Sequence, residues 1–247
     1  MVDFIIVGTQ RSGTTYIRRC LDSHSMIQCH GEVFEKRYRD PFGYYEYIDD
    51  SLPRRIKHLL LRGVAVNDYL DYLSSVSTAP IVGFKLMRSQ FRRIPYRFPM
   101  LLDQIKAGDI KIIQVIRRNI LKTYLSRLSA QVSGRYHAKS DSDVVKLTVN
   151  TSHIISELDI IHAENEWWQV MLSGTDFMVV EYENFVVNKD DESRRMLDYI
   201  GVERYEELSS ANKKINPDDL SQMVLNFPEL EAMLQGTRYE YCLQSDQ

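Results

Sequence analysis

Four short apolar runs along the chain predict buried strands. They are Phe4–Gly8, Ile81–Leu86, Lys111–Ile116 and Phe177–Glu181. Each is brief and rich in β-branched or large apolar residues, as buried strands are. Because they are widely spaced along the chain, each connection is long enough to hold a helix.

Helix-compatible segments fill those connections. The predicted helices are Thr14–His24, Asp68–Ser75, Met100–Ala107, Leu121–Gln131, Ser152–Leu172 and Glu192–Ile200. Strands that alternate with helices predict an α/β fold with a mostly parallel central sheet flanked by helices. With 247 residues the chain suits a single domain over 1–247. We interpret 38–62 as a substrate-facing excursion with some helix, and we expect the tail from Asn212 to wrap back over the sheet.

Composition narrows the class of protein. Hydrophobic residues make up 44%, charged residues 26%, and the formal net charge is −3. This balance is typical of a soluble protein, and it gives no basic field that would favour nucleic acid as a partner. Cys20, Cys29 and Cys242 lack the spacing of a disulfide framework or zinc site. No run approaches the ~20 apolar residues of a membrane helix and no targeting segment is visible, so we expect a cytoplasmic protein.

The first predicted strand leads into Gly8-Thr9-Gln10-Arg11-Ser12-Gly13-Thr14-Thr15. A strand, a Gly-bounded loop and a helix in this order are typical of a loop whose backbone N–H groups cradle a phosphate. An ATP-binding loop would carry Lys after its second Gly, but here Thr14 stands there and the basic residue is Arg11. The loop is therefore predicted to hold a phosphate-like group without the usual Lys for the β- and γ-phosphates.

A second candidate anion site follows the third predicted strand. Arg118 stands at its carboxyl end, where open α/β sheets bind ligands. Ser126 comes eight residues later, a little over two helical turns, so both side chains could close on one phosphate. Alternatively, Arg118 pairs with a carboxylate and Ser126 packs within a helix; the spacing alone leaves both open.

Together these two segments resemble the sulfotransferases that use 3′-phosphoadenosine 5′-phosphosulfate (PAPS). Arg11–Thr15 is similar to their 5′-phosphosulfate loop. Their 3′-phosphate motif is similar to the pair Arg118-Asn119 together with Ser126. Three more segments resemble the family: Val180–Val186, Arg195–Val202 and Leu234–Tyr239, the last as in bacterial members close to the nodulation-factor enzymes. The resemblance implies a sulfotransferase architecture like that of P-loop nucleotide triphosphatases.

The resemblance also implies roles for individual residues. The donor would be held by Gln10, Arg11, Ser12, Gly13, Thr14, Thr15, Arg118 and Ser126. Glu32 would be the general base, with His30 as its rival, and Arg11 and Lys85 would stabilise the charge that develops on the leaving phosphate. Lys213 and Lys214 fall where family members can close over the donor. No metal is expected.

The expected activity is sulfuryl transfer from PAPS to an acceptor hydroxyl, with 3′,5′-adenosine bisphosphate (PAP) as product. The acceptor would be a glycan or lipid-linked sugar, or else a lipid or small metabolite. Two alternatives remain: a nucleotide-dependent small-molecule kinase with a degenerate loop, and a catalytically silent nucleotide-binding module. The sequence leaves the acceptor and the oligomeric state open.

Overall fold

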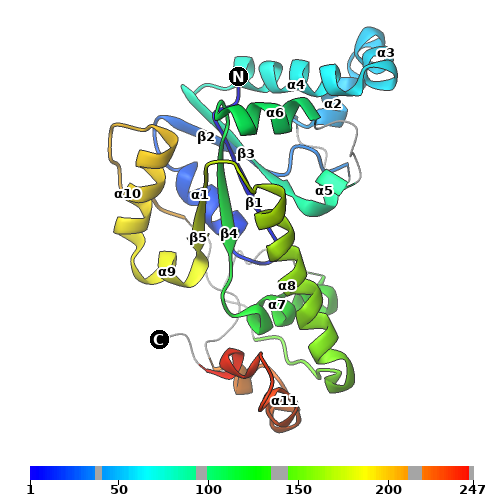
Figure 1. The fold of residues 1–247 in the computed structure, drawn as a ribbon, viewed down its shortest axis with the longest axis vertical. Coiled ribbons are helices and arrows are strands. Elements are labelled where there is room, and N and C mark those ends of the chain that lie inside the picture. The colour runs from blue at the N-terminus through cyan, green and yellow to red at the C-terminus, as the bar shows by residue number, and fades with distance from the viewer. Residues whose placement is uncertain (37–40, 93–98, 135–143, 211–218, 245–247) are drawn as a thin grey trace.

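A five-stranded parallel sheet forms the centre of the computed structural model, which describes residues 1–36, 41–92, 99–134, 144–210 and 219–244 (Figure 1). The strands are β1 (Phe4–Gly8), β2 (Ile27–His30), β3 (Ile81–Met87), β4 (Lys111–Ile116) and β5 (Phe177–Glu181), in the spatial order β2-β3-β1-β4-β5. Every pairing is parallel, which confirms the predicted α/β fold. The carboxyl ends of the strands therefore meet at one edge of the sheet.

Helices occupy the connections between these strands and the part of the chain after β5. They are α1 (Thr14–Leu21), α2 (Tyr44–Asp49), α3 (Leu52–Leu60), α4 (Arg62–Val76), α5 (Arg88–Arg92), α6 (Pro99–Ala107), α7 (Ile120–Ser133), α8 (Ile154–Met171), α9 (Tyr182–Val187), α10 (Lys189–Ile200) and α11 (Phe227–Leu234). Short 3₁₀ helices span Thr151–His153 (η1), Leu220–Gln222 (η2) and Glu240–Leu243 (η3). Each predicted helix is present with shifted ends; the largest shift is at α4, which begins at Arg62 rather than Asp68. Among the described helices, none has the length and apolar character needed to cross a bilayer.

The sequence pattern did not predict the edge strand β2. Its four residues, Ile27-Gln28-Cys29-His30, alternate apolar and polar positions over too short a distance to stand out as a strand. The segment pairs with β3 on one side only. Its extended conformation thus depends on the neighbouring strand more than on its own composition.

Apolar clusters cover both faces of the sheet. On one face, α1, α9 and α10 supply Ile17, Phe185 and Met196 to a cluster with strand residues. On the other, α2, α4, α6 and α8 supply a second cluster that includes Tyr69 and Trp168. Figure 1 shows α9 and α10 to one side of the strands and α4 and α6 to the other. Burial on both faces explains why the central strands are continuous apolar runs.

The C-terminal region packs elsewhere than expected. Instead of wrapping back over the sheet, α11 and η3 join α7 and α8 in a third apolar cluster that contains Leu125, Leu158, Leu230 and Cys242. In Figure 1 α11 lies at the end of the molecule farthest from α3 and α4, and α8 runs from the centre toward it. Helices α7 and α8 have apolar side chains that do not pack on the sheet. The C-terminal region packs on these side chains, which explains why it does not cover the sheet. Lys213 and Lys214 lie outside the described residues.

Candidate active site

The loop between β1 and α1 has a sharply turned backbone. Arg11 has a φ of 69° and Gly13 a φ of 96°, both in the left-handed region. Left-handed residues within a turn are a feature of backbone nests that bind anions. For Arg11 this conformation is uncommon and strained, as is found at functional sites. Since α1 begins at Thr14 and has no acidic residue in its first turn, its N-terminus adds further attraction for an anion.

Two glycines allow this loop to pack closely on its neighbours. A Cβ at Gly8 would lie 2.5 Å from the carbonyl oxygen of Val115 in β4. A Cβ at Gly13 would lie 2.2 Å from the ring of Tyr182, which follows β5. Only glycine fits at Gly13, because the position combines a left-handed φ with this close approach. The loop is thereby placed against the ends of β4 and β5.

Helix α7 contacts the loop directly. The Arg11 Nε donates a hydrogen bond of 2.9 Å to the Ser126 hydroxyl. One residue later, Arg127 donates from Nε to the Gln10 carbonyl oxygen at 3.3 Å and from Nη2 to the Glu164 carboxylate at 2.6 Å. Two segments that the sequence singled out separately thus meet at the carboxyl edge of the sheet.

A second cluster joins the loop helix to β2 and β3. The Lys85 ammonium donates to the Thr15 hydroxyl at 3.0 Å and lies 2.8 Å from the Glu32 Oε1. Lys85 is 7% exposed, so this charge is held away from water beside its two partners. One lysine therefore connects the residue predicted as general base with the first turn of α1.

Gln90, on α5, orients the other oxygen of Glu32. Its Nε2 donates to Glu32 Oε2 at 2.8 Å, while its Oε1 accepts from the Met87 N–H at 3.1 Å. The amide is only 2% exposed. Because both ends of the amide are bonded, its orientation is determined and the Glu32 carboxylate is fixed between Lys85 and Gln90.

His30, the rival base, contacts different groups. Its Nε2 lies 3.0 Å from the Ser77 hydroxyl and its ring packs against Phe42 at 5.2 Å between centroids. The Ser77 hydroxyl donates its one proton to the Leu73 carbonyl oxygen at 2.7 Å. The His30 Nε2 must therefore be the donor to Ser77, and that nitrogen has no free lone pair for a substrate proton.

Arg118 does not join Ser126 at the loop. Its guanidinium pairs with the Glu181 carboxylate at the end of β5, and its side chain is 66% exposed. The hydrogen bond to Glu181 raises the pKa of Arg118 above its usual value. Of the two arrangements that the spacing allowed, Arg118 adopts the one with a carboxylate partner, while Ser126 contacts the loop.

The backbone that carries Arg118 is held from two sides. The Glu183 carboxylate accepts the N–H groups of Arg118 and Asn119, at 2.9 and 3.2 Å. From η3, the Tyr241 hydroxyl donates to the Arg118 carbonyl oxygen at 3.3 Å, and Asn119 donates in turn to the Cys242 carbonyl oxygen at 2.9 Å. Burial raises the pKa of the Tyr241 hydroxyl, which stays a neutral donor.

The structure thus brings most of the predicted site residues together at one edge. Arg11 contacts Ser126, and Lys85 contacts both Thr15 and Glu32. Ser12 is buried in the loop and Thr14 at the start of α1. Sequence reasoning missed Gln90, Arg127 and Glu183. Two of them had a signal in the sequence: Arg127 is next to Ser126, and Glu183 lies in the Val180–Val186 segment. Gln90 had none.

Across the described ranges, no three His, Cys, Asp or Glu side chains group in a way that could hold a metal ion.

The chain has an all-parallel α/β fold with a sharply turned loop between β1 and α1 at the carboxyl edge of the sheet, the edge where open α/β sheets bind ligands. A model of the sulfotransferase domain matches residues 2–231, and the chain belongs to this family. The family resemblance drawn from the sequence is confirmed, and the chain is a transferase of the sulfotransferase class. Family membership also counts against the kinase alternative.

Two solved structures share the fold. A sulfotransferase from Alicyclobacillus acidocaldarius is 14% identical, with a TM-score of 0.50 over 100% of this chain and 97% of that one. A sulfotransferase domain from the curacin biosynthetic pathway is 13% identical, with a TM-score of 0.50 over 99% of this chain and 83% of that one. A comparison with curated protein sequences gives no match. At these identities the likeness extends to the fold alone.

Proposed function

We propose that this protein transfers the sulfuryl group of PAPS to an acceptor hydroxyl, with Glu32 as general base. The observation that carries the proposal is the position of Lys85, which bonds Thr15 of the phosphate-binding segment and Glu32 at once. A base, a cation and an anion-binding loop in mutual contact are the parts that in-line transfer requires.

In this reaction the acceptor oxygen attacks sulfur while its proton passes to the Glu32 carboxylate. The bond between sulfur and the bridging oxygen breaks, and the electron pair stays on that oxygen, so PAP leaves with added negative charge. Lys85 and Arg11 stabilise that charge, together with the N–H groups of the loop and the hydroxyls of Thr14 and Thr15. Transfer is then mostly alignment and charge stabilisation by groups already in place.

The 3′-phosphate of the donor would bind Arg118 and Ser126, while Gln10, Ser12 and Gly13 line the 5′ end. This assignment needs Arg118 to leave Glu181 for the phosphate, and it needs Ser126 to share its hydroxyl with Arg11 or release it. The Arg118 side chain is 66% exposed, whereas Ser126 is buried. The exchange of Arg118 from Glu181 to a phosphate is therefore compatible with the described packing.

The donor is tested by calorimetric titration of the protein with PAP and, separately, with ADP plus Mg²⁺. We expect PAP to bind more tightly, because only PAP carries a 3′-phosphate. Tighter binding of ADP would contradict the proposal and favour the kinase alternative.

The acceptor is sought with radiolabelled PAPS and an extract of the source cell, followed by mass spectrometry of the labelled product. Binding of PAP without transfer to any acceptor would favour the silent nucleotide-binding module.

A further inference from the structure

Arg88, the first residue of α5, carries a charge that the described residues leave without a counter-charge. It follows β3 directly and stands two residues before Gln90, which bonds Glu32. Its guanidinium lies 5.0 Å from the centroid of the Trp167 ring. Within the described part of the chain it meets no carboxylate, and its buried Nε has no hydrogen-bond partner. Because a partly buried charge is costly unless it is paired, this cation indicates a place for an anion.

Trp167 places this cation near the start of the loop between β1 and α1. The next residue on α8, Trp168, donates from its indole Nε1 to the Gly8 carbonyl oxygen at 3.3 Å, and the centroids of the two indole rings are 4.9 Å apart. Phe91, three residues after Arg88, packs on Trp167 at 5.6 Å between centroids. The guanidinium therefore stacks on a ring that other aromatic side chains hold in place, at the carboxyl edge of the sheet.

Lys85 and Glu32 balance each other's charge and leave that of Arg88 unbalanced. The Lys85 ammonium lies 2.8 Å from the Glu32 Oε1, and the partner of the other oxygen, Gln90, is neutral. Residues 72–102 contain five basic residues and no acidic one, so the neighbouring sequence supplies no carboxylate either. A ligand with a negative charge would supply what this part of the site lacks.

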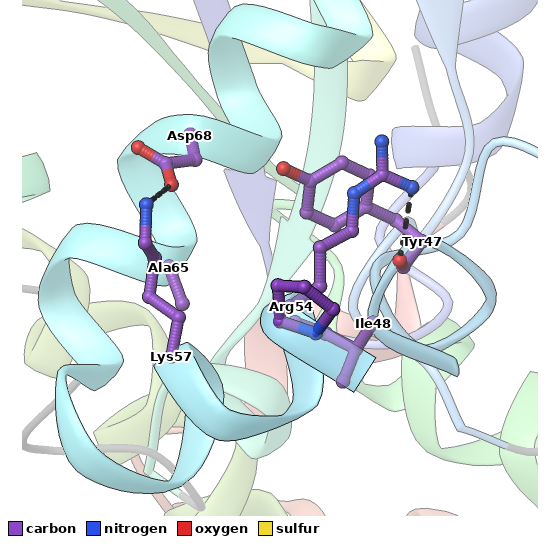
Figure 2. Close-up of a pocket in the computed structure, with 7 residues that line it drawn as sticks. Tyr47, Ile48, Arg54, Lys57, Ala65 and Asp68 are labelled. Atoms are coloured by element: carbon purple, nitrogen blue, oxygen red, sulfur yellow. Dashed lines mark hydrogen bonds and ion pairs between the residues drawn. The ribbon is translucent and has the colours of Figure 1, made fainter. Parts of the chain in front are cut away.

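The cavity shown in Figure 2 illustrates the opposite case. It has a volume of about 200 Å³, lies between α2, α3 and α4, and is also lined by basic side chains, those of Arg54 and Lys57. Arg54 donates to the Asp50 carboxylate at 2.8 Å, and Lys57 to the Asp68 carboxylate at 2.5 Å. Carboxylates of the protein satisfy these two cations, whereas the described residues supply none for Arg88.

We propose that Arg88 binds an anionic group of the acceptor, which would carry a phosphate, sulfate or carboxylate besides the hydroxyl that receives the sulfuryl group. This inference rests on the proposed function. Arginine presents planar donors that match an oxyanion, and stacking on Trp167 holds that plane in place.

The position of Arg88 favours the acceptor over the donor. Strands β3 and β4 lie on opposite sides of β1. The 3′-phosphate of the donor is assigned to Arg118 and Ser126, which follow β4, whereas Arg88 follows β3. Its helix also holds Glu32 through Gln90, and the acceptor hydroxyl must reach Glu32 to lose its proton. An acceptor held by Arg88 would thus approach from the side of the base.

Titration of the PAP-saturated full chain with inorganic phosphate tests the anion site. Ionic strength is kept constant, and the fluorescence of Trp167 and Trp168 is followed. We expect a saturable change in the wild type and binding about tenfold weaker or more in Arg88→Gln. Arg194→Gln is the matched control, because that guanidinium also stacks on a ring, 3.7 Å from the Tyr205 centroid, but lies on α10. It should bind phosphate like the wild type.

The acceptor itself is tested by passing an extract of the source cell over an anion-exchange resin before transfer from radiolabelled PAPS. We expect the label in the retained material, and phosphatase treatment of that material distinguishes a phosphate from a sulfate or carboxylate. Arg88→Gln should need about ten times more acceptor for half its maximal rate, with the maximal rate little changed, because uniform binding is lost. Arg88→Lys keeps the charge without the planar fork and should fall between the two. PAP affinity should be equal in all variants.

Three results would overturn the proposal. The first is an acceptor found only in the material that the resin does not retain. The second is an Arg88→Gln variant with wild-type phosphate affinity and acceptor dependence, which would place the phosphate at the sulfuryl position beside Lys85. The third is a loss of PAP affinity in Arg88→Gln, which would assign Arg88 to the donor. Absence of label from every fraction, with Arg88-dependent phosphate binding intact, would instead overturn the proposed function and leave an anion site at Arg88.

Discussion

The two halves of the candidate site are held very differently. On the side of β1 and β3, Lys85 and Gln90 are 7% and 2% exposed, and each bonds two partners. On the side of β4 and β5, the Arg118 side chain is 66% exposed and pairs with Glu181. The half proposed for transfer is thus buried and bonded on several sides, whereas the half proposed for the 3′-phosphate must exchange a partner to bind it.

Elementary electrostatics explains the contrast. Removing a partner from a buried charge leaves that charge unpaired at a high cost, so a network such as Glu32–Lys85 has little freedom to rearrange. An exposed ion pair contributes little, about 0–1 kcal/mol, and a phosphate that offers more charge and more acceptor atoms can displace its carboxylate. We infer a rigid transfer half and an adjustable donor half.

The largest expected effect is on the rigid half. Glu32→Gln keeps the shape of the side chain but removes the base, so turnover should fall about 100-fold or more while PAP affinity changes little. Steady-state transfer assays and calorimetry measure the two quantities. Glu35→Gln, three residues along the chain, is the matched control and should retain wild-type turnover. If Glu32→Gln turned over at the wild-type rate, the base would have to be sought elsewhere, with His30 next.

The adjustable half is probed by Arg118→Ala. Loss of a charge-assisted contact to the 3′-phosphate should weaken PAP binding about tenfold or more. Binding of 5′-AMP, which has no 3′-phosphate, should stay the same and serves as the internal control. Calorimetry with both ligands gives the comparison. Equal losses for PAP and 5′-AMP would show that Arg118 supports the site generally and does not recognise the 3′-phosphate.

In both halves, local features could be predicted from sequence and long-range contacts could not. The loop 9–15 stands out locally, because a strand, two glycines and a helix start follow one another. The four longer strands were equally clear, since burial on both faces makes them continuous apolar runs. By contrast, β2 and the position of Glu32 depend on pairing with β3, a contact between residues far apart in the chain.

Gln90 shows the limit of sequence reasoning most plainly. It lies on α5 without a motif, and its role arises only because α5 turns back from β3 toward Glu32. The Arg118–Glu181 pair was likewise out of reach, although a carboxylate partner for Arg118 was one of the two alternatives. Which carboxylate it meets depends on β5 lying beside β4. Local pattern therefore predicts the elements, and tertiary contact selects the partners.

A moderate effect is expected from Gln90→Leu. The leucine fills similar volume but leaves the Met87 N–H without its acceptor and Glu32 without one donor. Unfolding free energy should fall by about 1–3 kcal/mol, and turnover should fall about tenfold, less than for Glu32→Gln. Denaturant unfolding and the pH profile of turnover measure these separately, and Gln90→Glu provides a second variant of similar shape. A loss of stability with an unchanged pH profile and turnover would restrict Gln90 to a structural role.

The smallest expected effect has the opposite sign. Glu181→Gln weakens the partner that Arg118 must leave, so PAP affinity should rise about two- to fivefold, the scale of an exposed ion pair. Glu183→Gln is the contrasting control: that carboxylate holds the backbone N–H groups of Arg118 and Asn119, and its loss should lower PAP affinity. Calorimetry at low and high salt measures both, with the gain from Glu181→Gln shrinking as salt screens the pair. A fall in PAP affinity for Glu181→Gln would mean that Glu181 positions Arg118 for the phosphate rather than competing with it, and the donor half would then be as preorganised as the transfer half.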